Sequence, residues 1–124
     1  MIDILNFIKT GMESIGVNYE FGEWTSDIVY PYFVGEYQES AVDSEDGLQS
    51  STFILTGFSR NTFLELAQEK EKIKAYFSPE GITAIAETGN AMAVSYSHSL
   101  AIPTGEAELK KLEIYLDCKE WKVT

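Results

Sequence analysis

Hydrophobic side chains recur at steps of three and four in the first segment of the chain, roughly residues 2–15. The repeating positions are Ile2, Leu5, Ile8, Met12 and Ile15. This spacing places them on one face and predicts an amphipathic helix. The next residue, Gly16, is suited to end the helix in a left-handed conformation, whereas Gly11 weakens its interior.

A second helical pattern starts near Asn61 and ends before the Ser78-Pro79 pair. Thr62 and Glu65 have the spacing of a capping box at its N-terminus. The apolar stripe consists of Phe63, Leu66, Ala67, Ile73 and Phe77. The opposite, wet face carries Glu65, Gln68, Glu69 and Lys72. This segment is the clearest predicted element in the chain.

Elsewhere apolar and polar residues alternate, which predicts strands. The predicted strands are residues 17–21, 32–38, 51–58, 82–86, 92–98 and 109–123. The order of elements is then α-β-β-β-α-β-β-β, in one domain spanning residues 1–124. Because the helices are segregated among hairpins, we expect an α+β fold with a mainly antiparallel sheet.

Two of these strands carry a pattern that can be checked residue by residue. In the second strand, Phe33 and Tyr37 fall on one face and Tyr32 and Val34 on the other. In the last strand the apolar alternation runs through Cys118 and then changes phase at Trp121 and Val123. That change predicts a bulge at the end of the strand.

The net charge of the chain limits which classes of partner it is expected to bind. It has 20 acidic and 9 basic residues, a formal net charge of -11. A phosphate-binding surface is therefore a poor first expectation. Apolar runs are too short to span a bilayer, and the N-terminal segment lacks the features of a signal peptide. The single cysteine excludes an internal disulfide and fits synthesis in a reducing compartment.

Residues that could carry chemistry are few. His98, the only histidine, lies at a strand end, where serines two apart would not aim a hydroxyl at its ring. Cys118 belongs to an apolar alternation and has carboxylates nearby in sequence, which raise a thiol pKa. Asp43, Glu45 and Asp46 do not fit the EF-hand spacing, although a loose divalent-ion site there stays open. We expect no catalytic residues, no cofactor and no dedicated metal site.

The remaining candidates are surfaces for contact. The aromatic segment around Pro31 and a stretch near residue 100, which looks like a loop, carry more apolar side chains than a small core needs. Aromatic and aliphatic anchors of this kind are typical of interfaces, although both segments could instead cap the core. The candidate contact residues are Tyr32, Phe33, Tyr37, Val42, Leu48, Leu100, Ile102 and Pro103.

Four stretches together resemble the tail terminator, or tail completion, proteins of long-tailed bacteriophages. They are the N-terminal helix leading into a strand, YPYFVGEYQES with the acidic turn DSEDG, STFILTGFSRNTFLELAQEKEKIKAYF, and KKLEIYLDCKEW. The stretches cover most of the chain. Such proteins are non-catalytic α+β domains of the virion, made in the host cytoplasm.

The resemblance implies a ring, possibly a hexamer, that caps the tail tube and meets the head connector. DNA would pass through its lumen without specific binding, and an acidic wall would repel it. The hairpin from Tyr32 to Phe58, with its tip at residues 42–48, would then reach the neighbouring subunit or the tube, and the 100–106 loop is the second candidate for such a contact. A neighbouring neck component such as a head-completion protein, an acidic DNA-mimic inhibitor, and last an enzyme built around His98 remain as alternatives.

Overall fold

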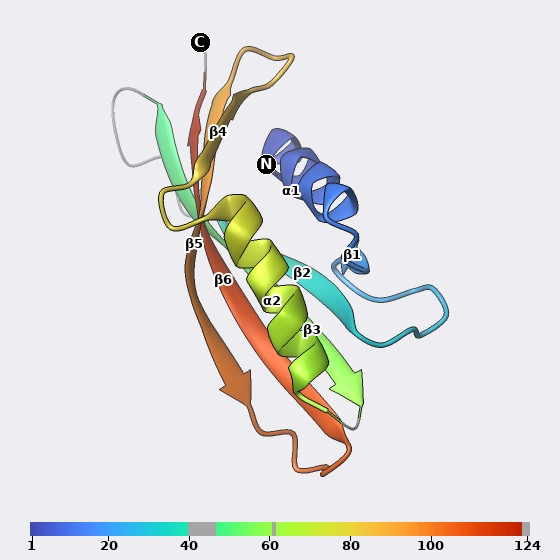
Figure 1. The fold of residues 1–124 in the computed structure, drawn as a ribbon. Coiled ribbons are helices and arrows are strands. Elements are labelled where there is room, and N and C mark those ends of the chain that lie inside the picture. The colour runs from blue at the N-terminus through green and yellow to red at the C-terminus, as the bar shows by residue number, and fades with distance from the viewer. Residues whose placement is uncertain (40–46, 61, 123–124) are drawn as a thin grey trace.

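The fold comes from a computed structural model that describes residues 1–39, 47–60 and 62–122. These residues form two helices and a six-stranded, mixed sheet (Figure 1). The helices are α1 (Ile2–Ser14) and α2 (Leu64–Phe77). The strands are β1 (Tyr19–Phe21), β2 (Tyr32–Glu39), β3 (Leu48–Arg60), β4 (Ile82–Ile85), β5 (Ala91–Ile102) and β6 (Leu109–Trp121). The predicted α+β class with a mainly antiparallel sheet is confirmed.

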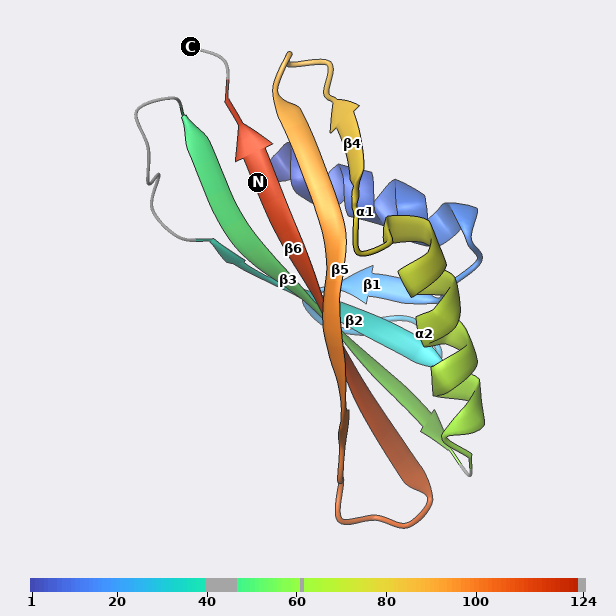
Figure 2. The same cartoon turned by 60° about the vertical axis from the view of Figure 1, so that its left-hand side comes forward.

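The strands lie side by side in the order β1-β2-β3-β6-β5-β4. β1 pairs with β2 in parallel, and all the other pairs are antiparallel. Both helices pack on the same side of the sheet, which we call the helix face (Figures 1 and 2). Among the described residues, no helix covers the opposite side, the open face. The sheet therefore has one face that builds the core and one that meets the surroundings.

The core lies between the helices and the helix face. α1 contributes Ile4, Ile8 and Met12, each with no exposed surface. The predicted apolar face of α1 was thus partly wrong, because Ile2 is 74% exposed and Ile4 takes its place. The alternation expected for β2 and β6 is confirmed, with Phe33 buried and Ile114, Leu116 and Cys118 buried in turn. These side chains belong to the main buried cluster.

Gly11 and Gly16 are glycines for different structural reasons. Gly16 has a φ of 72° just after α1, as its position predicted. Gly11 is buried where α1 meets α2, and a Cβ there would lie 2.7 Å from the Tyr76 ring. The glycine that weakens the helix locally therefore allows the close approach of the two helices.

The predicted start of α2 was wrong. The helix begins at Leu64, after Phe63 at its N-cap; Asn61 lies outside the described residues. The capping box is not formed, because the Thr62 hydroxyl accepts from the Leu64 N–H at 3.0 Å while Glu65 accepts from the Ser59 hydroxyl at 2.7 Å. A tertiary partner on β3 takes the carboxylate that a local cap would have used.

The strand boundaries that differ most from the predictions are those of β3 and β5. β3 starts at Leu48, three residues early, and continues to Arg60. β5 continues to Ile102, so Leu100 and Ile102 lie in a strand and only Pro103 begins the loop. Long antiparallel pairing with β6 extends both strands past the points where their own alternation ends.

The predicted bulge was placed in the wrong strand. The register between β3 and β6 runs without a break to Trp121, whereas the register shift lies in β5 between Tyr96 and His98. Glu120 is buried on the helix face and Trp121 continues the open-face phase. Val123 lies outside the described residues.

Candidate interaction surfaces

One half of the open face carries an aromatic patch instead of the polar side chains expected on a solvated sheet face. The pairing registers place its members at the start of β2, in the second half of β3, and on the parts of β6 and β5 that lie beside them. We define the aromatic patch as Tyr32, Ile54, Phe58, Leu100 and Tyr115. Gln38, Thr52, Asp117 and Ser95 align across the other half, which is polar.

Ring contacts hold the β2 side of the aromatic patch together. The Tyr32 and Phe58 rings stack with centroids 5.3 Å apart, and Trp24 packs against Tyr32 at 4.7 Å. Lys111 places its ammonium 6.0 Å from the Phe58 centroid. Burial is the largest cause that raises the pKa of the Tyr32 phenol. These contacts fix aromatic side chains on a face that neither helix of the described residues covers.

The loop of residues 22–30 brings Trp24 to this surface. The Glu20 carboxylate organises the loop, because it accepts from the Thr25 hydroxyl at 2.7 Å and from the Thr25 and Ser26 N–H groups at 3.2 Å. The bond from the Thr25 hydroxyl is the largest cause that lowers the Glu20 pKa. An exposed carboxylate is thus the anchor of the segment that supplies Trp24.

His98 lies on the β5 side of the patch and stacks on Tyr115, with ring centroids 4.4 Å apart and planes at 7°. The expectation considered serines two apart in the strand, but the adjacent residue supplies the contact, since the Ser97 hydroxyl lies 2.9 Å from His98 Nδ1. The bulge brings these adjacent residues together. His98 is exposed, and the stack and the hydrogen bond fix its ring on the surface.

Cys118 has the core position that its alternation predicted. Its side chain is 1% exposed, and burial raises the pKa of the thiol to about 12. A thiol with a raised pKa holds little thiolate near neutral pH, and the thiolate is the nucleophile. The residue therefore acts in packing at this position.

Two strand segments are left without a strand partner on their outer side in the described part of the chain. β4 pairs with β5 only from Ala91 to Val94, so residues 97–102 have β6 on one side alone. β1 pairs with β2 only from Phe33 to Gly35, which leaves residues 36–39 in the same situation. We call these the β5 edge and the β2 edge. Such edges are templates for pairing with another chain.

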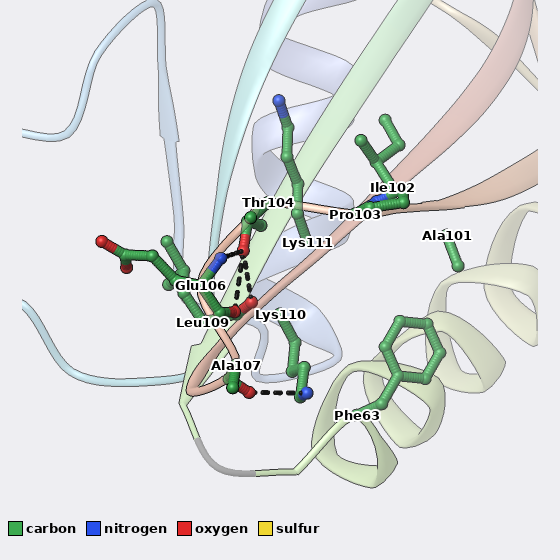
Figure 3. Close-up of a pocket in the computed structure, with 11 residues that line it drawn as sticks. Phe63, Ala101, Ile102, Pro103, Thr104, Glu106, Ala107, Leu109, Lys110 and Lys111 are labelled. Carbon is green, nitrogen blue, oxygen red and sulfur yellow. Dashed lines mark hydrogen bonds between the residues drawn. The ribbon is translucent and has the colours of Figure 1, made fainter.

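A groove lies beside the end of the β5 edge, between the start of α2 and the tip of the β5–β6 hairpin (Figure 3). We call it the tip groove; Phe63, residues 101–107 and residues 109–111 line it, and its volume is about 410 Å³. The Thr104 hydroxyl holds the tip in shape, donating to the Leu109 carbonyl at 2.8 Å and accepting from the Glu106 N–H at 3.1 Å. Lys110 stands at the rim and donates to the Ala107 carbonyl.

The predicted contact residues lie in different environments in the structure. Phe33 is fully buried under the helices, so its prediction as a contact residue was wrong. Tyr37 packs against the core, and burial raises its phenol pKa to about 12. Leu48 is partly buried at the start of β3, and Val42 lies outside the described residues. Tyr32 and Ile102 are partly exposed on the open face, Leu100 is 53% exposed there, and Pro103 lines the tip groove.

The surface also contains contact candidates that the sequence did not single out. They are Phe21, Trp24, Phe58, Phe63 and Tyr115. Alternation placed Phe58 and Tyr115 on a strand but did not show that they share one uncovered face. The tip groove had no sequence signal, because its two sides are almost forty residues apart in the chain.

Charge is spread unevenly over the described residues. The registers place Glu20, Glu36, Glu113 and Asp117 on the open face with Arg60, Lys111 and Lys119, so acidic groups exceed basic ones there by one. α1 and α2 together carry five acidic and four basic residues, so most of the excess negative charge of the described residues lies in the loops. No group of three or more described His, Cys, Asp or Glu residues is placed to hold a metal ion. Asp43, Glu45 and Asp46 lie outside the described residues.

In the part of the chain that the structure describes, no helix is long and apolar enough to cross a membrane. No protein-family model matches the chain. No curated protein sequence matches it either.

Proposed function

We propose that this chain is a structural subunit of a phage tail, which caps the tail tube as a ring and joins it to the head connector. The four stretches that resemble tail terminator proteins support this proposal, and so does the α+β fold that the resemblance implies. The surface features offer contact area, with an aromatic patch on an uncovered face. In this reading the molecule acts by assembly and not by catalysis.

The two unpaired edges are the observation that carries the proposal. They lie on opposite margins of one sheet, and β2 runs antiparallel to β5, as the pairings through β3 and β6 require. The β5 edge of one copy can therefore take the β2 edge of the next in an antiparallel pair. Contacts between two different surfaces of identical subunits are head-to-tail, and they close into a ring when the rotation allows.

The position of the edges along the strands also suits a ring. The β2 edge is at the C-terminal end of β2, and the β5 edge is at the C-terminal end of the oppositely directed β5. Successive sheets would therefore be staggered along the strand direction. A closed sheet needs such a stagger, because its strands tilt relative to the axis.

The net charge of -11 is compatible with DNA passing through the ring. A wall that carries few unpaired cations gains little from phosphate contacts, and repulsion keeps DNA from adhering. The open face, with four acidic and three basic groups, and the acidic loops both meet this requirement.

The test is the mass of the chain alone and with assembled tail tubes. We expect a ring, either free or bound to tube ends, when measured by native mass spectrometry and electron microscopy. The Leu100→Asp, Ile102→Asp double variant should remain folded and fail to assemble. Ile85→Asp is the matched control, because Ile85 is 77% exposed on the same face but outside both edges.

The outcome separates the alternatives. A chain that stays monomeric and ignores tubes at high concentration contradicts the proposal. Binding to the head connector without any binding to tubes would instead favour a head-completion protein. Assembly that survives in the double variant removes Leu100 and Ile102 from the interface.

A further inference from the structure

Phe21 is an exposed aromatic residue at the end of a short edge strand. It is 45% exposed, and its ring lies 6.0 Å from that of Phe53, which places it on the helix face. It pairs with Gly35, directly before the β2 edge begins. The side chain therefore projects at the boundary between the paired and the unpaired part of β2.

The tip groove has the corresponding position on the opposite margin. Ala101 pairs with the buried Leu112, which puts it on the helix face, and Phe63 stands across the groove from it (Figure 3). Pro103 follows the last residue of β5 and continues the lining. The groove thus begins where the β5 edge ends.

Antiparallel pairing of the two edges brings these features together. With the β2 edge of a second copy along the β5 edge, residues before Glu36 of that copy lie beyond Ile102. β1 of the second copy occupies its β2 up to Gly35, so Phe21 meets the end of β5. Both features lie on the helix face of a sheet that continues from one copy to the next.

We propose that the tip groove binds the Phe21 side chain of a second copy of this chain. This inference rests on the head-to-tail ring proposed above and names its anchor. The groove volume of about 410 Å³ is within the range of ligand pockets, about 300–1,000 Å³, and accommodates an aromatic ring. Aromatic anchors in pockets carry much of the binding energy of interfaces.

Charged side chains lie beside both partners. Exposed Glu23 lies two residues after Phe21, and the groove lining includes Glu106 as well as Lys110 and Lys111. Complementary charge at a rim mainly accelerates association and fixes the register. With two lysines and one glutamate, the groove lining has a net positive charge in a chain with 9 basic and 20 acidic residues, and this favours an acidic segment as its partner.

The first experiment compares Phe21→Ala and Ala101→Trp, which remove the anchor and fill the groove, by sedimentation velocity of the full chain with and without tail tubes. Each variant is expected to weaken self-association by at least about 30-fold, the effect of losing an aromatic hot spot. Thr83→Ala, at an exposed position on β4, is the control. Circular dichroism checks that all variants are folded.

Mixing the two variants tests the direction of the contact. Phe21→Ala keeps an intact groove and Ala101→Trp keeps an intact anchor, so an equimolar mixture should form dimers that cannot grow. An additional pair, Phe21→Cys and Ala101→Cys, should form an intermolecular disulfide when the two proteins are mixed under oxidising conditions. Thr83→Cys mixed with either should not.

The possible results are distinct. Wild-type assembly that persists unchanged in Phe21→Ala overturns the groove contact and leaves the ring intact. Binding of small apolar ligands in the groove without any effect of Phe21 also overturns it. Wild-type chain that never assembles, with or without tubes, overturns both the ring and its anchor.

Discussion

Gly57 of β3 lies directly opposite Phe33 of β2, and the Phe33 ring lies across the space where a side chain on Gly57 would stand. A Cβ there would be 2.4 Å from the ring. A diagonal contact of the same kind lies nearby, because Gly35 pairs with Leu55 and a Cβ on Gly35 would be 2.6 Å from the ring of Phe53. Aromatic rings packed over strand glycines fix the register of neighbouring strands. Two such pairs define how β2 sits on β3.

Gly57→Ala is expected to lower the free energy of unfolding by about 1–3 kcal/mol, the usual cost of overpacking a core. On strand propensity alone the change should be neutral or favourable, because glycine weakens strands. Urea denaturation of the variant and of Thr52→Ala, on the open face of the same strand, measures the difference. Equal stability of the two variants would show that the Phe33 ring moves aside at little cost.

The raised pKa of the Cys118 thiol predicts that the folded protein loses stability at alkaline pH. Its folded pKa, about 12, is above the ordinary value of about 8.5, so the folded state retains the proton longer. The contribution is complete below about pH 8.5 and is lost as pH rises toward the folded pKa, with a limiting slope of about 1.4 kcal/mol per pH unit. We expect the free energy of unfolding to fall more steeply between about pH 8.5 and about pH 10 in the wild type than in Cys118→Ala. Parallel pH profiles would contradict the buried, protonated thiol.

The lowered pKa of Glu20 predicts that the loop carrying Trp24 opens at acid pH. Its folded pKa is lowered, chiefly by the hydrogen bond from Thr25, so its stabilising effect is present above the unfolded value, about 4.3, and is lost as pH falls through the folded pKa. Glu20→Ala should increase hydrogen exchange in residues 22–30 at neutral pH. Wild-type exchange corrected for intrinsic rates should show the same opening only in acid. Glu23→Ala, on the same loop, is the control, and equal protection in both variants would exclude the anchor.

Ser59 and Glu65 connect the end of β3 to the first turn of α2. The buried Ser59 hydroxyl donates to Glu65 at 2.7 Å. Because Glu65 is only partly buried, water replaces part of the bond, and Ser59→Ala should cost about 1 kcal/mol. A double-mutant cycle with Glu65→Ala measures the coupling by chemical denaturation. Additive effects of the two substitutions would show that the bond contributes nothing to stability.

Local pattern was enough to predict both helices, every strand and the buried face of β6. It failed where contacts between residues far apart in the sequence determine the structure. The carboxylate of Glu65 bonds across to β3 and not to its own helix end, and pairing with β6 carries β5 through Leu100 and Ile102. The buried face of α1 includes Ile4, one helical turn before Ile8, whereas Ile2 at the first turn is exposed.

The candidate surfaces were less accessible to sequence reasoning than the fold. The alternation places Tyr32 on the open side of its strand, but the predicted contact residue Phe33 next to it is buried under the helices. The tip groove combines Phe63 with Ala101, and the β5 edge exists only because β4 is short. None of these follows from spacing along the chain, because each depends on which strands become neighbours.

The bulge in β5 makes Ser97 the extra residue of its strand. Tyr96 faces the helices and His98 faces outward, as consecutive residues of a regular strand would. Deleting Ser97 would therefore leave every later side chain of β5 on its present face, whereas deleting a residue from the evenly paired β6 would turn the rest of that strand over. Ser97 is thus a position in the sheet where a residue can be removed without changing which of the later side chains of β5 face outward.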